Sequence, residues 1–248
     1  MDTAALPSYV RLLGPFRFEC AAGAVSVTPN GQRLIAYLGL QCAASRTVVA
    51  GTLWPDVTEG HAQGSLRTTL WRLNRGHSPV VEARGDTLAL SNGVQVDVHA
   101  FTRMALQLVN APETFGEELP LDLFSCGDLL PGWGEEWVMF ERERLHQLKM
   151  HAIETLSTLL ASRGRYALAL EAALTCVRME PLRESAHRAV VTVHLAEGNA
   201  VEAYRHYETF RALIAEKMGM GPSEHFTALL PPRRQDSRGQ HPLLGDGP

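Results

Sequence analysis

The chain has 248 residues, of which 45% are apolar, and a formal net charge of −4. This length and apolar fraction allow one large domain or two ordinary domains with buried cores. Because the net charge is negative, the molecule cannot bind nucleic acid as a uniform polycation, and any nucleic-acid site must be a local patch.

The sequence carries no sign of a membrane span, a signal peptide or a metal site. No apolar run approaches the roughly 18 residues that cross a bilayer, and no basic segment precedes a long apolar run. The cysteines are widely spaced, without a C-x-x-C pair, so no zinc site or redox pair is indicated; they are Cys20, Cys42, Cys126 and Cys176. We therefore expect a cytoplasmic protein without a metal or other cofactor.

The first hundred residues alternate between strand and helix patterns. Residues 9–28 hold short apolar runs broken by glycine and proline, which predicts a small antiparallel meander. Helical spacing follows, and we expect three helices over residues 30–42, 46–54 and 61–75, the first with Asn30 as its N-cap.

A hairpin pattern follows the third expected helix. Two β-like runs flank the turn Arg84-Gly85-Asp86, and Asn92-Gly93 forms a second tight turn into a last strand. Strands, three helices and a terminal hairpin together predict an α+β winged helix-turn-helix over residues 1–107.

The second half of the chain predicts an all-α domain. A helix near 101–109 leads into a Pro- and Gly-rich linker, and a long helix begins near Trp137. Gly164 and Gly198 then begin two similar helical segments with a 34-residue period, which is typical of tetratricopeptide repeats. We place this domain at 112–230, and the Pro-, Gly- and charge-rich residues 231–248 are expected to be a disordered tail.

Arginines gather on the third expected helix and at the tip of the hairpin. Residues 61–85 contain four arginines and one glutamate, a local formal charge of +3 on a chain of −4. Leucines three and four apart would hold the helix to the core, while its other faces present groups that suit phosphates and base edges. The candidate DNA-binding residues are Ser65, Arg67, Thr68, Thr69, Arg72 and Arg75, with Arg84 of the hairpin expected in the minor groove.

Several of these features have ordinary structural explanations. Arginines on an exposed helix often form only a solvated face, and Trp71 is expected to pack against the hairpin or the following domain. In the helical repeats, Tyr166, Tyr204 and Tyr207 are candidates to line a groove for a protein partner. The same tyrosines would equally suit the core between repeats.

The sequence lacks the motifs of an enzyme. It has no G-x-x-x-x-G-K-[ST] phosphate loop, no H-E-x-x-H and no G-x-S-x-G. Without a nucleophile–base pair or a metal-ligand cluster, we do not expect catalysis.

Two parts of the sequence carry a family resemblance. The runs VRLLGPFRFE, GQRLIAYLGL, SLRTTLWRLNR and RGDTLAL resemble the OmpR-type winged helix at the head of the SARP regulators (Streptomyces antibiotic regulatory proteins). The run LAEGNAVEAYRHYETFRALIAEKMGMGPS resembles the bacterial transcriptional activator domain that follows it in those proteins. The resemblance covers Val10 to about Leu229.

This resemblance implies a sequence-specific transcriptional activator, in which a pair of copies binds direct repeats in double-stranded DNA near the −35 promoter element. It also implies recruitment of RNA polymerase through the sigma factor and alpha subunit, and control of a biosynthetic gene cluster. By position, the third helix supplies the recognition residues Arg67, Thr68, Thr69 and Arg72, with Arg75 near phosphates. Arg84 matches the wing arginine, and the segment with Trp54, Asp56 and Glu59 matches the polymerase-contact loop.

The sequence departs from the family pattern at two places. The usual R-L-R at the end of the recognition helix is Arg72-Leu73-Asn74, so a phosphate contact is expected to be lost or altered. The aromatic residue usual in the wing is absent from GDTLAL.

Two function hypotheses of different classes follow. The first is a DNA-binding transcriptional activator of the SARP type, associated with the nucleoid and at least dimeric on DNA. The alternative is a protein-interaction adaptor whose winged helix has lost specific DNA readout and whose repeats hold a partner.

Overall fold

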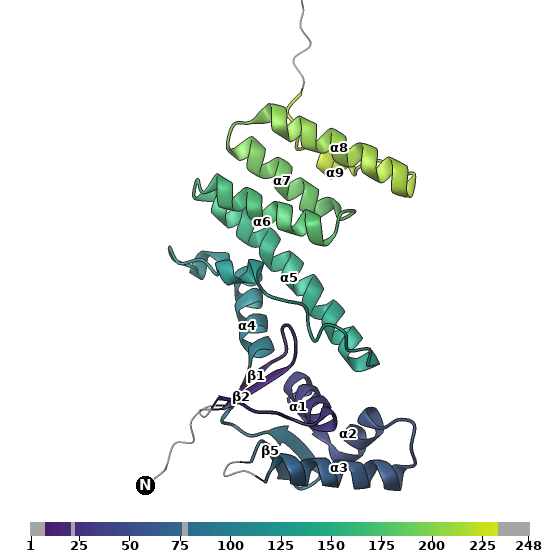
Figure 1. Cartoon of the computed structure of the whole chain (residues 1–248). Coiled ribbons are helices and arrows are strands. Elements are labelled where there is room, and N and C mark those ends of the chain that lie inside the picture. The colour runs from purple at the N-terminus through teal and green to yellow at the C-terminus, as the bar shows by residue number, and fades with distance from the viewer. Residues whose placement is uncertain (1–7, 21–22, 76–78, 233–248) are drawn as a thin grey trace, which may run out of the picture. The chain divides into compact units, whose positions relative to one another are not determined.

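The structure is a computed structural model that describes residues 8–20, 23–75 and 79–232. The chain divides into two compact units, residues 1–156 and 157–248, each considered by itself below (Figure 1). The domain boundary expected between residues 107 and 112 stays a prediction. Apart from residues 231 and 232, the expected tail lies outside the described residues.

Three helices form the centre of the first unit, as the sequence predicts. They are α1 (Pro29–Gln41), α2 (Arg46–Leu53) and α3 (Glu59–Leu73). The N-cap of α1 is Thr28 and not Asn30: the Thr28 hydroxyl accepts from the Gly31 N–H at 3.4 Å. Pro29 explains the shift, because proline lacks an N–H and its fixed φ suits the first helical position.

The winged-helix core forms where the apolar faces of these helices meet a small sheet. Leu34, Leu38, Leu53 and Leu66 are almost fully buried and belong to one cluster with Leu88 of the sheet. In each helix two members of the cluster are four residues apart, which produces this common face: Leu34 and Leu38, Val49 and Leu53, and Ala62 and Leu66.

Two small sheets frame the helices. The first has the order β3-β2-β1-β7 and the second the order β4-β6-β5. Their strands are β1 (Ser8–Arg11), β2 (Arg17–Cys20), β3 (Gly23–Ala24), β4 (Ala43–Ser45), β5 (Val81–Arg84), β6 (Thr87–Leu90) and β7 (Val94–Val96). The meander and the hairpin are confirmed, whereas the sequence did not predict β4 or the parallel pairing of β7 with β1.

The end of β1 is fixed to the start of α4 (Asp97–Asn110) by one carboxylate. Asp97 accepts from the backbone N–H of Leu12 at 2.9 Å and of Leu13 at 3.0 Å, and also from its neighbour Val98 at 2.8 Å. A carboxylate at a helix start also interacts favourably with the helix dipole. This single side chain therefore links two segments more than 80 residues apart.

The segment expected to be a linker packs against the winged helix. After two short 3-10 helices, η1 (Pro112–Thr114) and η2 (Leu121–Phe124), it reaches Leu129 and Leu130, which are buried. Leu130 donates its N–H to the Leu12 carbonyl at 2.9 Å, and Gly14 donates to the Asp128 carbonyl at 2.8 Å. The segment is thus part of the first compact unit.

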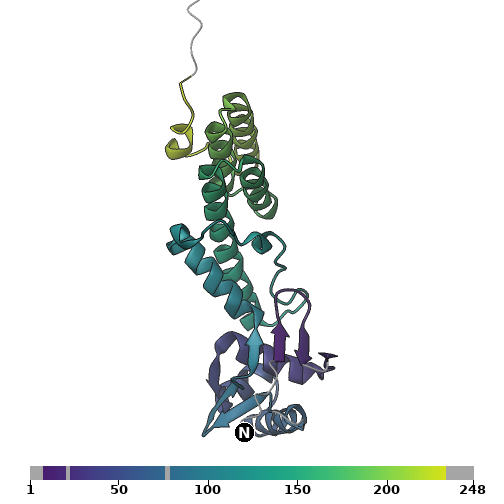
Figure 2. The ribbon, with the colours of Figure 1, turned by 90° about the vertical axis from the view of Figure 1, so that its left-hand side faces the viewer.

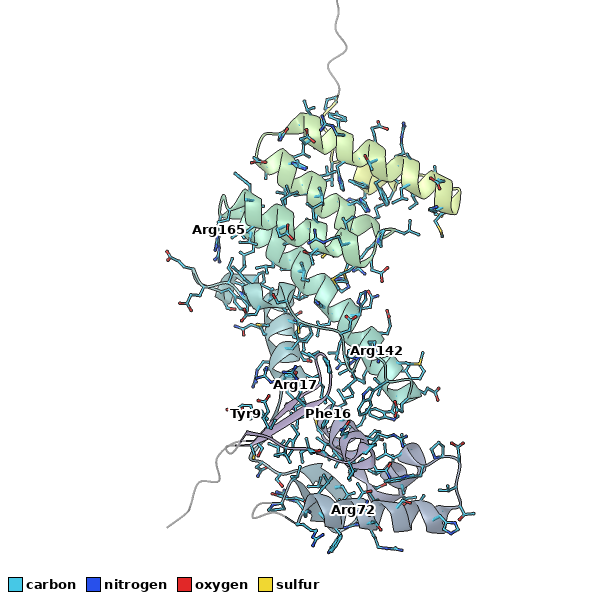
Figure 3. All side chains as sticks on the ribbon, in the orientation of Figure 1. Tyr9, Phe16, Arg17, Arg72, Arg142 and Arg165 are labelled. Carbon is cyan, nitrogen blue, oxygen red and sulfur yellow. The ribbon has the colours of Figure 1, made fainter. Side chains whose placement is uncertain are left out.

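An arginine of the long helix α5 (Glu136–Ser162) holds the end of this segment. The Arg142 guanidinium donates to the carbonyls of Leu129 and Leu130, each at 2.7 Å, and of Trp133 at 3.0 Å (Figure 3). The fork of donors on arginine suits such a cluster of acceptors. Irregular backbone, which cannot pair with itself, gains its hydrogen bonds from this side chain.

The second unit confirms the 34-residue repeat. It contains α6 (Tyr166–Met179), α7 (Glu184–Ala196), α8 (Ala200–Met218) and α9 (Glu224–Thr227). Both views show α6, α7 and α8 stacked in order (Figures 1 and 2). Gly164 and Gly198 turn the chain at φ +71° and +86° before α6 and α8, and Ala169 and Ala203 are fully buried at equivalent places.

A histidine pair lies inside this helical stack. His187 is buried, its ring stacks on Phe210 with centroids 4.3 Å apart, and its Nε2–H donates to the Pro181 carbonyl at 2.9 Å. Since a carbonyl only accepts, Nδ1 of neutral His187 is left to accept from Nε2–H of His206 at 3.0 Å. Burial lowers the pKa of both rings, that of His206 to about 4, with a smaller contribution from His187 and His194.

The three hydrogen bonds of Arg142 to backbone carbonyls predict a large loss of stability when this side chain is replaced. Arg142→Met should lower the free energy of unfolding of the first unit by about 2–4 kcal/mol, because three carbonyls lose a charged donor. All four tryptophans of the chain lie in this unit, so their fluorescence during urea unfolding measures it. The control is Arg144→Met, which removes an exposed arginine of the same helix paired with Glu141. An equal loss of unfolding free energy in both variants would contradict this role of Arg142.

The histidine pair predicts that the second unit loses stability in acid. The folded-state pKa of His206 lies below its unfolded value of about 6.5, so its contribution is present above pH 6.5 and is lost as pH falls toward 4. The protection factors of α7 and α8 in hydrogen–deuterium exchange, which correct for the slower intrinsic exchange in acid, should therefore fall over this range. His206→Gln, which keeps a donor for His187, should flatten the pH dependence, and the exposed His225→Gln should not.

Candidate nucleic-acid interface

The helix α3 has one buried side and one exposed side. Ala62 and Leu66 are buried against α1 and α2, with Leu70 and Leu73 packed at the edge of the same cluster. The side chains on the opposite side are open to solvent. The exposed side chains of α3 and its end are Glu59, His61, Arg67, Thr68, Trp71, Arg72 and Arg75.

The structure places Thr69 differently from the other expected recognition residues. Thr69 is only 4% exposed, and its hydroxyl donates to the Ser65 carbonyl at 2.8 Å. It follows Leu66 by three residues and precedes Leu73 by four, so it lies on the packed side of the helix. Thr68 is exposed and donates to the Gly64 carbonyl at 3.0 Å, and Ser65 is partly buried.

The arginines of α3 differ from several exposed arginines of other helices. Arg144 on α5 and Arg205 and Arg211 on α8 each pair with a glutamate three residues earlier, at 2.7–2.8 Å. Within the described part of the chain, no carboxylate pairs with an arginine of this helix: Arg67, Arg72 or Arg75. Their charge is therefore not neutralised locally, which distinguishes this surface from an ordinary solvated helix face.

A polar recess lies beside this exposed side. Its volume is about 400 Å³, and its lining combines hydroxyls, an imidazole and a guanidinium from α3 with a residue of the first turn of α1. The lining includes Asn30, His61, Ser65, Thr68 and Arg72. These groups suit an anion such as a phosphate.

The hairpin of β5 and β6 carries the expected wing arginine at an exposed tip. Gly85 has φ +61°, the left-handed conformation that this two-residue turn requires. The Arg84 side chain is 78% exposed and lies 3.5 Å from a Glu82 carboxylate oxygen, an exposed pair that solvent screens strongly. The tip is anchored because Arg46 donates its N–H to the Asp86 carbonyl at 2.9 Å.

Asn74, which stands where the family has arginine, has a structural role. Its Nδ2 donates to the Val81 carbonyl at 2.8 Å, and its Oδ1 accepts from the N–H groups of Val80 and Val81 at 3.0 and 3.2 Å. The residue ends α3 and fixes it to the first strand of the wing. The sequence gives only the departure from the pattern, and not this role.

Trp71 is not the packing residue that the sequence predicts. Its side chain is 59% exposed, and the guanidinium carbon of Arg75 lies 4.4 Å from the centre of its ring. The prediction is wrong because the neighbouring Leu70 takes the position that faces the core.

The segment expected to contact polymerase is mostly exposed. Asp56 and Glu59 are open to solvent, but Trp54 is partly buried against the winged-helix core. Beside it lies a groove of about 460 Å³ between the end of α2 and the start of α5. Pro55 and Phe140 line this groove, and Phe140 is 68% exposed.

The three tyrosines expected in a partner groove have different surroundings. Tyr207 is 8% exposed, packs edge-to-face on Phe226 and shares a 2.9 Å hydrogen bond with Thr227, so it belongs to the core and not to a groove surface. Tyr166 and Tyr204 are partly buried, and the Tyr204 hydroxyl donates to the Pro231 carbonyl.

The described residues contain no cluster of histidine, cysteine, aspartate and glutamate that could hold a metal ion. A search of the same residues for a helix with the length and apolarity to cross a bilayer finds none.

A comparison with protein families identifies the chain. The model described as "bacterial transcriptional activator domain" matches residues 89–230, more than half of the sequence. The chain belongs to this family. Its winged helix followed by this domain gives the same order of parts as in the SARP regulators that the sequence resembles.

The fold as a whole is also found in a solved structure. The chain is similar to Mycobacterium tuberculosis EmbR, solved in complex with a low-affinity phosphopeptide, with a TM-score of 0.73 and 18% sequence identity. The match covers 91% of this chain and 64% of the EmbR chain, so this chain spans less than two thirds of that protein. No curated protein matches the chain.

Proposed function

We propose that this activator binds a specific duplex site, with α3 in the major groove and Arg84 of the wing in the minor groove. The observation that carries the proposal is the set of arginines on α3 that no carboxylate pairs with in the described residues. Arg67, Thr68 and Arg72 face outward together, and the polar recess beside them suits a backbone phosphate.

The role of each side chain follows from its chemistry. Arg72 presents a fork of donors that can read guanine in a bidentate manner, whereas Arg75 at the end of α3 is assigned to phosphate. Thr69 is left out of the contact set because it is buried. Two copies would bind side by side on direct repeats, as in the SARP regulators that the sequence resembles.

Activation would follow from contact between the exposed segment after α2 and the sigma and alpha subunits of RNA polymerase. Asp56 and Glu59 offer negative charge to a basic partner surface. The adjoining groove, lined by Pro55 and Phe140, adds exposed apolar area, which is what an interface core needs.

One prediction from the proposed function concerns readout of DNA by Arg72. Selection of bound duplexes from a random pool at about 0.15 M salt should yield paired short repeats. Arg72→Ala should then weaken binding of the best duplex by about 1–3 kcal/mol if the side chain reads a base. If it contacts only phosphate, affinity should fall for all duplexes and the salt dependence should decrease by about one counterion.

The matched control is Arg144→Ala, which removes an exposed, paired arginine from α5 and should leave DNA affinity unchanged. Failure of the wild-type protein to enrich any sequence would contradict the proposal. It would favour the adaptor hypothesis, in which the helical repeats hold a protein partner.

Another prediction from the proposed function concerns the groove beside the polymerase-contact segment. Phe140→Ser should reduce activated transcription by bacterial RNA polymerase holoenzyme about tenfold without changing affinity for the selected duplex, since loss of one buried aromatic anchor typically costs that much. Met139→Ser, which changes an exposed neighbour outside the groove lining, is the control. Equal activity of both variants and the wild type would exclude the groove as a contact.

A further inference from the structure

An exposed indole stands within the arginine-bearing side of α3. Trp71 is 59% exposed, although a large apolar side chain on a solvated helix normally turns toward a core. The core position nearby is already filled by Leu70. Nothing in the packing of the described residues therefore accounts for a tryptophan at this position.

Helix geometry places this ring among the proposed DNA contacts. With about 100° of rotation per residue, Trp71 and Arg72 lie on either side of the line through Thr68, at about 60° and 40° from it. Arg75 follows the end of α3 by two residues. The indole thus shares the side of α3 that faces outward with the unpaired arginines.

Arg75 fixes how this indole is presented. Its guanidinium carbon lies 4.4 Å from the ring centre, so one face of the indole is covered by a cation and the remaining surface is open. A stacked cation reduces the rotamers that the ring samples, and less conformational entropy is then lost when the ring meets a partner.

The chemistry of the DNA major groove limits which groups the open part of the indole ring can contact. In the major groove, base edges present hydrogen-bond donors and acceptors and one apolar group, the 5-methyl of thymine. Bases inside an intact duplex offer no face for stacking, and a phosphate can accept only from the indole N–H and not from the apolar part of the ring. A methyl group is therefore the complementary partner for this indole.

We propose that Trp71 contacts the 5-methyl group of a thymine in the bound site, and that Arg75, stacked on the ring, holds it in place. This inference rests on the proposed function, because it requires α3 in the major groove. Trp71 is then a specificity-determining residue that distinguishes thymine from the other bases by an apolar contact.

The test is removal of that methyl group. In the duplex selected by the wild-type protein, each thymine is replaced in turn by uracil, which pairs identically but lacks the methyl. At one position per repeat, affinity of the wild-type protein should fall about threefold to fivefold, as expected for loss of one buried methyl. Trp71→Ala should bind the unmodified duplex more weakly and be insensitive to uracil there, and Trp71→Phe should regain part of the sensitivity.

Two controls separate this contact from a general loss of binding. Arg67→Ala should bind more weakly and keep the full thymine-to-uracil ratio, and Tyr9→Ala, which removes an exposed aromatic ring outside α3, should bind both duplexes as the wild type does. If the wild-type protein binds its duplex specifically but no uracil substitution changes affinity, or Trp71→Ala keeps the wild-type ratio, the inference is wrong. If no specific duplex is recovered at all, the proposed function itself fails.

Discussion

The first unit depends on two charged side chains that satisfy irregular backbone. Asp97 accepts from the N–H groups at the end of β1, and Arg142 donates to three carbonyls of the segment that reaches α5. Residues 12–13 and 129–133 lie outside the named strands, so their backbone N–H and C=O groups would otherwise be left without hydrogen bonds near the core, which costs stability. The joint between the winged helix and α5 therefore combines these side chains with the backbone hydrogen bonds of Leu130 and Gly14.

The position of this joint determines which surfaces remain for a partner. The segment around Trp133 and Trp137 packs on Phe16 and Tyr37, which lie beside β2 and on α1. Arg33 of α1 also pairs with Glu135 at 2.9 Å. These contacts use the sides of α1 and the first sheet, so the exposed side of α3 and the tip of the wing stay uncovered within this unit.

The sequence predicted most elements of the fold and the location of the candidate interface, because helical spacing and turn residues are local signals. It did not predict β4, a three-residue strand too short for any periodicity, or the packing of the linker, which depends on long-range contacts of Asp97 and Arg142. At the candidate interface, the sequence showed which residues α3 contains. It did not show that Thr69 is buried and Trp71 exposed, because this depends on how far the packed side extends around the helix. The sequence showed only that Asn74 departs from the family pattern. It did not predict the structural role of this residue, because its hydrogen-bond partner Val81 lies seven residues away on a strand.

Arginine has opposite roles in this molecule, and the difference explains how a chain of net charge −4 can present a cationic surface. Arg142 donates to backbone carbonyls, whereas Arg144, Arg205 and Arg211 are each next to a carboxylate, so these three ion pairs contribute little field at a distance. Three residues before Arg67, Arg72 and Arg75 the chain has Gly64, Thr69 and Arg72 where those helices have glutamate, so the arginine charges there are not cancelled in this way. Under the proposed function, a negative net charge would limit nonspecific attraction to DNA, while the local field would orient α3 toward the duplex.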